Sequence, residues 1–318
     1  MVKQIRIRSG VAVIDRGADI YVGHLQRNLI FNDRDVILIL RQLREWITCE
    51  KLLKSNTDQP GMIFEVITQL DEAGLIEKRE YSANGLELII THMNEVGTLL
   101  APLLLQHGFS VSTLDSRSAT AADVCGQYLR MSDIGESFKD VIVAQQRELR
   151  NSGKNANALG QSVVNSKKLV LVTSYPEPEL LATMMADGYE YLCAMATPFG
   201  AVLGPRVKPG ITPCFFCIEL WRSELDDQWQ KVAASIFMAR NEPVPMSSAL
   251  LTVAAAMEFL VPTIYSEIPH ENLATTHSLT YEMGERDHST PSITSTPSIT
   301  NTSQKWSIHP ECSCHWAR

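Results

Sequence analysis

Two pairs of closely spaced cysteines constrain the fold of this chain more than any other feature of its sequence. The first pair is Cys214 and Cys217, and the second pair is Cys312 and Cys314. Four thiolates in two close pairs match a tetrahedral structural zinc site, and an all-sulfur shell favours zinc over magnesium or calcium. The pattern therefore predicts that the end of the chain returns to the neighbourhood of residue 214.

Other interpretations of these cysteines stay open at this point. A redox disulfide between Cys214 and Cys217 explains the first pair but leaves the second pair without a role. His309 and His315 flank the second pair, and either imidazole is able to replace one thiolate as a ligand. Four protein ligands leave no position for water, so we expect a structural metal and no hydrolysis at it.

The composition is that of a folded, acidic chain. Its 318 residues include 45% hydrophobic residues, which is enough for about two domains with a sizeable core. Lys and Arg number 28 against 36 Asp and Glu, so no basic excess is present to replace the counterions of a nucleic acid. The N-terminus does not resemble a signal peptide, and Glu258 and Pro262 interrupt the most apolar stretch. We expect a cytoplasmic protein without nucleic-acid or membrane partners.

The first 84 residues are expected to form a separate module. Residues 3–14 and 19–31 alternate apolar with polar side chains, which is the period of half-buried strands. Three helices then follow between Asp33, a good N-cap, and Gly74, which is placed to end the third helix. A wing strand completes the order, so the module is predicted to be a winged helix.

The third helix of this module disfavours DNA binding. Residues 61–73 include no Lys or Arg, although a helix in the major groove needs donors for bases and phosphates. A groove between a strand edge and an apolar helix is better suited to an added peptide strand. The sequence therefore favours peptide recognition by this module.

Residues 85–288 are expected to form an α/β domain. Apolar strands at residues 86–90, 109–115, 168–173 and 191–196 alternate with helices, which indicates a mostly parallel, Rossmann-like sheet covered by helices. Residues 289–304 contain a repeated Thr-Pro-Ser-Ile-Thr motif and are predicted to be a flexible linker. That linker would deliver a zinc-binding tail at 305–318.

A nucleotide site is predicted to be absent from the α/β domain. The turn after the first strand keeps only Gly97 of the glycines that cradle phosphates, and Glu95 places a negative charge there. Asp115 does end the next strand, where a ribose-binding acid would lie. No nucleophile and base are recognisable, and we expect the scattered histidines, His92, His107, His270 and His277, to be structural or solvent-exposed and not catalytic.

The two cysteine segments resemble a known family. The stretch from Gly204 to Trp229 resembles the "GP…PG-x-TPC-x-x-C…R…D…W" signature of ThiF-like, ubiquitin-activating-type proteins of azole peptide biosynthesis. The tail from His309 to Cys314 is similar to the terminal "HP-x-C-x-C" of that family. Its members are partner subunits of cyclodehydratases in thiazole/oxazole-modified peptide pathways, including the McbB-like B subunits of microcin-type azole synthetases.

The resemblance implies roles for particular residues. It assigns the four zinc ligands to Cys214, Cys217, Cys312 and Cys314. It also implies that the winged helix recognises the leader of a precursor peptide, which would add a strand between an edge strand and the third helix. The implied edge is Asn28, Leu29, Ile30 and Phe31, and the implied facing helix presents Val66, Ile67 and Leu70.

The resemblance further implies partners. A separate YcaO-type subunit would use ATP to close Cys, Ser or Thr side chains onto backbone amides, and a flavin-dependent azoline oxidase often accompanies it. This chain would be a non-catalytic subunit, expected to form a homodimer, that raises the effective concentration of substrate. One alternative is an adenylating enzyme of the ubiquitin-activating type that acts on a peptide carboxyl terminus. Another is a zinc-containing winged-helix regulator.

Overall fold

The structure, a computed structural model, divides into two compact units. Unit 1 holds the described residues up to 81, and unit 2 holds those from 86 onward. The structure describes residues 2–55, 60–81, 86–124, 129–151, 167–263, 274–282 and 298–316.

Unit 1 combines two small antiparallel sheets with three helices. One sheet has the order β5-β1-β6 and the other the order β2-β3-β4. The strands are β1 Val2–Ile7, β2 Ala12–Asp15, β3 Ile20–His24, β4 Arg27–Phe31, β5 Ile47–Thr48 and β6 Ile76–Tyr81, and the helices are α1 Val36–Gln42, α2 Cys49–Ser55 and α3 Pro60–Glu72.

The third helix ends where the sequence predicted. Gly74 has a φ of 66°, and the backbone N–H of Leu75 donates to the carbonyl of Leu70 at 2.8 Å. Glycine adopts this left-handed conformation without steric penalty, so it turns the chain sharply out of α3. The strand that follows, β6, pairs with β1 in the register Ile7 to Ile76. The expected wing therefore lies against the N-terminal strand, in the sheet that does not contain β4.

The core of unit 1 is formed by the inward faces of these elements. Side chains from β3, α1 and α3 are almost completely removed from solvent, and they include Ile20, Val22, Leu40, Ile63 and Leu70. Each such side chain contributes roughly 1.5–3 kcal/mol when it leaves water. The apolar stripe of α3 is therefore used to hold the unit together.

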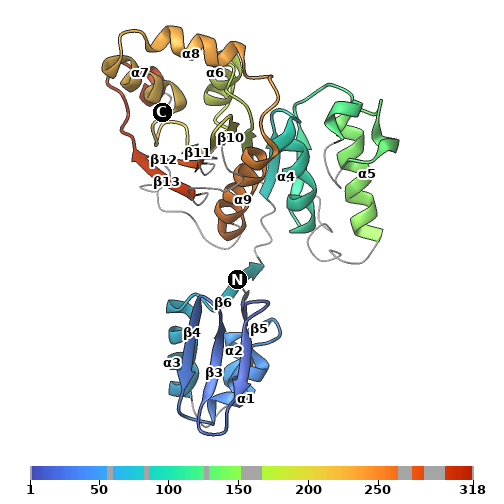
Figure 1. The fold of residues 1–318 in the computed structure, drawn as a ribbon, viewed down its shortest axis with the longest axis vertical. Helices are drawn as coiled ribbons and strands as arrows, with labels where there is room; N and C mark the ends of the chain where they lie inside the picture. Colours follow the sequence, from blue (N-terminus) through green and yellow to red (C-terminus); the bar gives the residue numbers. More distant parts are fainter. Residues whose placement is uncertain are drawn as a thin grey trace, which may run out of the picture. The chain divides into compact units, whose positions relative to one another are not determined.

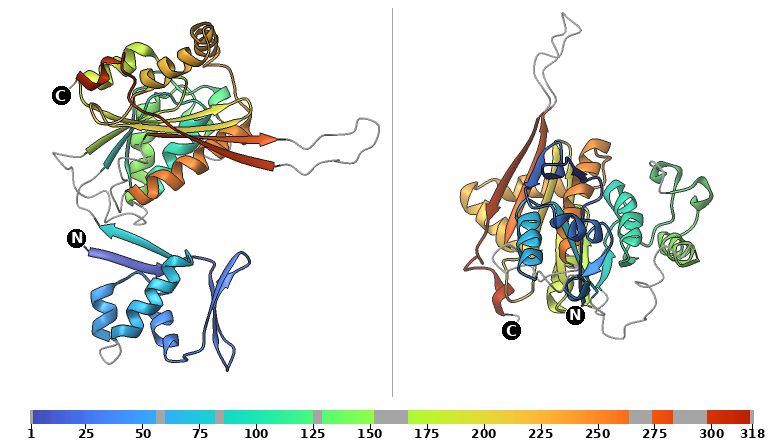
Figure 2. Two further views of the ribbon diagram at one scale, coloured as in Figure 1. Left: turned by 90° about the vertical axis from the view of Figure 1, so that its left-hand side faces the viewer. Right: turned by 90° about the horizontal axis from the view of Figure 1, so that it is seen from below.

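Unit 2 is built on a seven-stranded sheet with the order β13-β12-β11-β10-β9-β7-β8. Figure 2 shows α4, α5 and α9 on one face of the sheet and α6, α7 and α8 on the other. The strands are β7 Leu86–Ile90, β8 Ser110–Thr113, β9 Lys167–Val172, β10 Glu190–Thr197, β11 Gly200–Val207, β12 Thr275–Glu282 and β13 Ser298–Lys305. The helices are α4 Glu95–Gln106, α5 Phe138–Asn151, α6 Pro178–Ala186, α7 Phe215–Leu225, α8 Trp229–Met238 and α9 Met246–Thr263, with 3-10 turns at Ala121–Asp123, Met131–Asp133 and Ser313–Trp316.

Only half of the sheet is parallel, so the expectation of a mostly parallel sheet is corrected. Strands β8, β7, β9 and β10 run parallel, whereas β10 to β13 pair antiparallel. Two residues, Pro198 and Phe199, separate β10 from β11, and so short a connection forces the second strand to run back beside the first. The sequence analysis missed β11, β12 and β13.

The predicted flexible linker at 289–304 is wrong for residues 298–304. These residues belong to β13, which pairs with β12 from Glu282–Ser298 to Thr275–Lys305. Serine and threonine suggested a linker by composition, but β-branched threonines also suit an extended strand once a partner strand supplies hydrogen bonds. Residues 289–297 lie outside the described residues.

The longest helix of unit 2 is α9, which contains the apolar stretch noted in the sequence. It packs against β10, β11 and α4. None of the helices in the described part of the chain has the length and apolarity that a membrane crossing requires.

Candidate functional site

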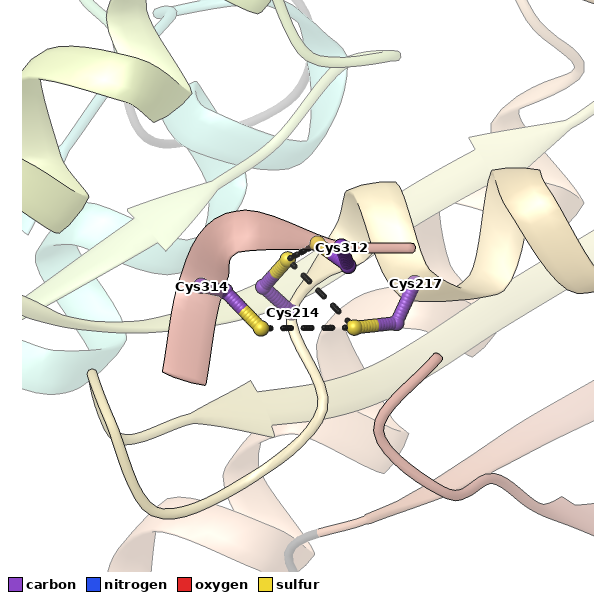
Figure 3. A group of neighbouring side chains, drawn as sticks. All are labelled: Cys214, Cys217, Cys312 and Cys314. Carbon is purple, nitrogen blue, oxygen red and sulfur yellow. Dashed lines mark hydrogen bonds between the residues drawn. The ribbon is translucent and has the colours of Figure 1, made fainter. Parts of the chain in front are cut away.

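The two cysteine pairs meet at the start of α7. Their four sulfur atoms all lie within 4.8 Å of one another, and all four residues are buried. In Figure 3 the side chains converge from α7 and from the C-terminal segment. The Sγ–Sγ distances are 3.8 Å from Cys214 to Cys217, 3.6 Å from Cys214 to Cys312 and 3.4 Å from Cys217 to Cys314.

This geometry fits a tetrahedral metal ion. Sulfur ligands at roughly 2.3 Å from zinc would be about 3.8 Å from one another, close to the measured Sγ–Sγ distances. The donor set is all sulfur, which suits zinc and does not suit magnesium or calcium. The four buried cysteines are therefore able to hold a metal ion, and a structural zinc is compatible with their geometry.

The start of α7 stabilises negative charge on these sulfurs. Cys214 is the N-cap of α7 and Cys217 lies in its first turn, where the helix dipole favours thiolates. The Cys214 thiol donates a hydrogen bond to Cys217, which lowers the pKa of Cys217, and the backbone N–H of His309 acts in the same direction. Donation to Cys217 and burial raise the pKa of Cys214. At Cys217 the deprotonated form, which is the form that binds a metal ion, is therefore already favoured over the thiol.

His309 supports the site from outside the ligand set. Its Nδ1 accepts a hydrogen bond from the backbone N–H of Glu311 at 3.1 Å, so Nε2 carries the proton and donates to Glu224 Oε1 at 3.0 Å. Its ring also packs edge-on against Trp221 at 4.6 Å. Both nitrogens are occupied, so His309 is not a ligand in this geometry. The side chain of His315 lies outside what the structure describes.

The implied leader-binding edge is an outer strand of unit 1. Asn28 to Phe31 belong to β4, which pairs with β3 on one side and forms the edge of the β2-β3-β4 sheet. Ile30 is 52% exposed and Leu29 is half-buried, whereas Phe31 is buried in the core. The backbone of an edge strand offers unpaired N–H and C=O groups to an incoming strand.

The implied facing residues of α3 do not all reach the surface, which corrects part of the prediction. Val66 is 2% exposed and Leu70 is not exposed, so both belong to the core of unit 1. Ile67 is half-buried, and Phe64, which the sequence analysis did not select, is 58% exposed. The helical period identified the apolar stripe correctly, but it does not show which apolar side chains of α3 remain exposed to solvent.

A large cavity lies at the carboxyl ends of β7 to β10 in unit 2. Its volume is about 1010 Å³, at the upper end of the usual range for ligand sites. Ligands of open α/β sheets bind at this position, where strand order reverses. The turn after β7 supplies Thr91, His92 and Asn94 to the wall, and Asp115 follows β8.

The turn after β7 is held by contacts between its own residues and the start of α4. Asn94 caps α4 by accepting from the N–H of Gly97 at 3.1 Å. A Cβ on residue 97 would collide with the carbonyl oxygen of His92. Gly97 is therefore needed for close packing between this turn and α4. Its missing side chain makes room for the backbone of His92, and not for a phosphate.

Two arginines of the cavity are paired with carboxylates. Arg117 contacts Asp115 at 2.8 Å, and Arg240 contacts Glu177 at 3.1 Å. His92 contacts Ser174 through Nδ1 at 3.0 Å, and burial lowers its pKa, so the ring is neutral near pH 7. The sequence predicted that Glu95 and Asp115 lie at this end of the sheet and that His92 is structural or solvent-exposed, but Arg117, Glu177 and Arg240 were not identified from it. One feature of the sequence could have pointed to several cavity residues: they follow directly after the carboxyl ends of the parallel strands.

Asp115 braces this end of the sheet instead of facing the cavity as a free acid. Its carboxylate accepts from the backbone N–H of Met93 at 2.9 Å and from the Arg117 side chain. Burial alone would raise the pKa of Asp115, but the guanidinium of Arg117 and the two backbone donors hold it below the ordinary value of 3.8. The acid at the position of a ribose-binding residue therefore already has partners within the chain.

We expect Asp115→Asn to destabilise unit 2 by roughly 1–3 kcal/mol at pH 7, because a buried charged acceptor is lost. A depressed carboxyl pKa gives stability that is present above pH 3.8 and is lost as the pH falls through the folded-state pKa. The difference in melting temperature between variant and parent should therefore shrink in acid. A difference that persists unchanged at pH 2 would contradict this assignment.

No family model matches the chain, and no curated protein matches it. Among solved structures it is similar to E. coli MccB with selenomethionine-labelled MccA, at 16% identity and a TM-score of 0.57 over 98% of this chain and 99% of that one. It is also similar to E. coli MccB with ATP, at 14% identity and a TM-score of 0.53 over 98% and 99%. The heterocyclase TruD matches at 14% identity and a TM-score of 0.49 over 98% of this chain and 42% of that one.

The finer likeness to B subunits of azole synthetases rests on the two cysteine segments and not on these structures. Identities this low carry information about the fold alone. Because MccB covers almost the whole of both chains, both units are included in the match. The chain has the ThiF-like, MccB-type fold.

Proposed function

We propose that the chain is the leader-peptide-binding scaffold subunit of a peptide heterocyclase. The complex would convert Cys, Ser or Thr of a ribosomal precursor peptide into thiazole or oxazole rings. One observation carries the proposal: the two segments that resemble the azole-peptide family meet in a single four-cysteine cluster. Two motifs far apart in sequence thus belong to one site, as the resemblance requires.

The peptide-binding part of the proposal rests on unit 1. Strand β4 is an edge of its sheet among the described strands, and it carries the exposed side chain of Ile30; Phe64 is an exposed apolar side chain on α3. The guanidinium of Arg27, at the start of β4, lies beside Gly74, just after the end of α3. Main-chain hydrogen bonds would supply affinity and the apolar contacts specificity. MccB, which has the same fold, binds MccA in a solved complex.

The proposal assigns the chemistry to partners. A YcaO-type subunit would activate the amide with ATP, and a flavin-dependent oxidase would convert azolines to azoles. The chain would act in the cytoplasm, as a homodimer within the complex, with zinc at Cys214, Cys217, Cys312 and Cys314. The metal would fix the C-terminal segment to α7, because four sulfur ligands leave no open position for a reactant.

A second candidate function is adenylation of a peptide carboxyl terminus. E. coli MccB, which has this fold, has been solved with ATP, and that observation favours this alternative. The residues at the positions where a nucleotide would bind argue against adenylation. The backbone of His92 packs against Gly97, and Asp115 already accepts hydrogen bonds from Arg117 and from the N–H of Met93. We therefore keep the scaffold role as the conclusion.

The decisive experiment uses the purified full chain and a short, Cys-, Ser- and Gly-rich peptide encoded beside its gene. We expect the chain to bind the front part of that peptide, and to consume no ATP until a neighbouring YcaO-type protein is added. Fluorescence anisotropy measures the binding, and phosphate or pyrophosphate release measures the turnover. ATP–pyrophosphate exchange by the chain alone would instead establish the adenylating alternative.

A further inference from the structure

The unit 2 cavity has more negative than positive groups among its described lining residues. All three arginines in the lining already contact a carboxylate: Arg117 contacts Asp115, Arg240 contacts Glu177, and Arg222 contacts Glu219 at 3.0 Å. An incoming phosphate would have to displace these internal partners. The cavity therefore offers no ready anion site within the described lining.

Three further carboxylates line the cavity without an ion pair among the described residues, and one of them, Asp123, already accepts hydrogen bonds from the backbone N–H and the hydroxyl of Thr120. Glu95 of α4 and Glu242, in the segment after α8, both line it, and neither forms an ion pair within the described part of the chain. His92 adds no compensating charge, because burial lowers its pKa and keeps the ring neutral. A cation entering the cavity would thus meet two carboxylates that are available for pairing.

Part of the wall that α7 and α8 supply is apolar and well anchored. Phe215 and Ile218 of α7 and Trp229 of α8 contribute to it. Glu219 ties these helices together, since it accepts from Trp229 Nε1 and from the Tyr175 hydroxyl, both at 2.8 Å. The cavity thus presents an ordered apolar surface beside its carboxylates, which suits a ligand with both a positive group and apolar parts.

We propose that this cavity binds a positively charged segment of the precursor peptide, with an arginine, lysine or amino-terminal ammonium near Glu95 and Glu242 and apolar side chains against α7 and α8. That the cation belongs to the precursor rests on the proposed function, whereas the charge preference rests on the lining residues alone. A volume of about 1010 Å³ exceeds what a single side chain fills. A second weak contact on the same chain would strengthen binding of a peptide whose leader is held elsewhere.

The test uses the full chain loaded with zinc and isothermal titration at low salt. The probes are the hexapeptide acetyl-Leu-Ser-Arg-Gly-Phe-Ser-amide, the same peptide with Gln for Arg, arginine amide alone, and ATP. We expect the Arg peptide to bind about tenfold more tightly than the Gln peptide and than arginine amide, and binding should weaken with added salt. ATP should not compete with it.

Two variants locate the site. The double variant Glu95→Gln with Glu242→Gln should reduce affinity for the Arg peptide about tenfold, whereas Glu136→Gln, an exposed carboxylate outside the lining, should leave it unchanged. Equal binding of the Arg and Gln peptides, competition by ATP, or an unaffected double variant would overturn the proposal. Tighter binding of arginine amide than of the Arg peptide would mean a free-amine site and would likewise overturn it.

The same variants separate this inference from the proposed function. Binding of the leader portion of the precursor to unit 1 should be unchanged in the double variant, because neither Glu95 nor Glu242 belongs to that unit. Loss of leader binding in the parent chain would contradict the proposed function. The charge preference of the cavity would still be decided by the hexapeptides.

Discussion

Replacing Cys217 with serine is expected to release the bound metal and to lower the stability of unit 2. Three of the four sulfurs would remain, but the lost thiolate is the one whose pKa is already lowered by its neighbours. Structural zinc contributes on the order of 10 kcal/mol to folding in small modules, so the loss should appear as a clear fall in melting temperature. Metal analysis of the purified protein should fall from one zinc per chain to almost none.

The matched control for this experiment is Cys49→Ser. Cys49 is also a free cysteine, but it lies half-buried in unit 1 and is not part of the four-cysteine cluster. It should keep its zinc and melt close to the parent. Unchanged zinc content in Cys217→Ser would refute the site. Treatment of the parent with a strong chelator should reproduce the effect of the variant.

Replacing Phe64 with aspartate should weaken binding of a leader peptide at least tenfold, or about 1.4 kcal/mol, without unfolding unit 1. Phe64 is 58% exposed, so little core packing is lost, while a charge replaces an exposed apolar side chain of α3, the helix that is proposed to face the leader. Anisotropy of a labelled leader measures the affinity, and circular dichroism checks the fold. Zinc content should not change.

Leu38→Asp provides the control on the same unit. Leu38 is 56% exposed on α1, so it offers the same chemistry at a different place. It should leave leader affinity within about twofold of the parent. If both variants bind the leader as the parent does, α3 does not face the leader.

Val66→Asp, by contrast, is not a test of peptide binding. Because Val66 is 2% exposed, its replacement buries an unpaired carboxylate in the core of unit 1 and should unfold the unit. The sequence pattern suggested this position because it lies on the apolar stripe of α3. Only burial in the folded unit separates Val66 from the exposed Phe64.

Local and chemical features were determined by the sequence itself. The stop at Gly74 depends on one residue that tolerates a positive φ, and the structure confirms it. The cysteine spacing predicted that the C-terminal segment would return to α7, since few arrangements other than a shared site use two close thiol pairs. The helix stop and the spacing within each cysteine pair depend on the residue type and on neighbours within one helical turn, which a sequence shows directly; the return of the C-terminal segment followed from the coordination chemistry of four thiolates.

The tertiary structure alone decided what depends on contacts between distant segments. It placed residues 298–305 in an edge strand, because β12 supplies the hydrogen bonds that a Ser/Thr-rich stretch lacks by itself. It also paired each cavity arginine with a carboxylate, and within the described part of the chain it left Glu95 and Glu242 without an ion pair. Strand pairing, burial and ion pairing are sums over neighbours brought together by folding, so local periodicity does not encode which partner each residue will meet.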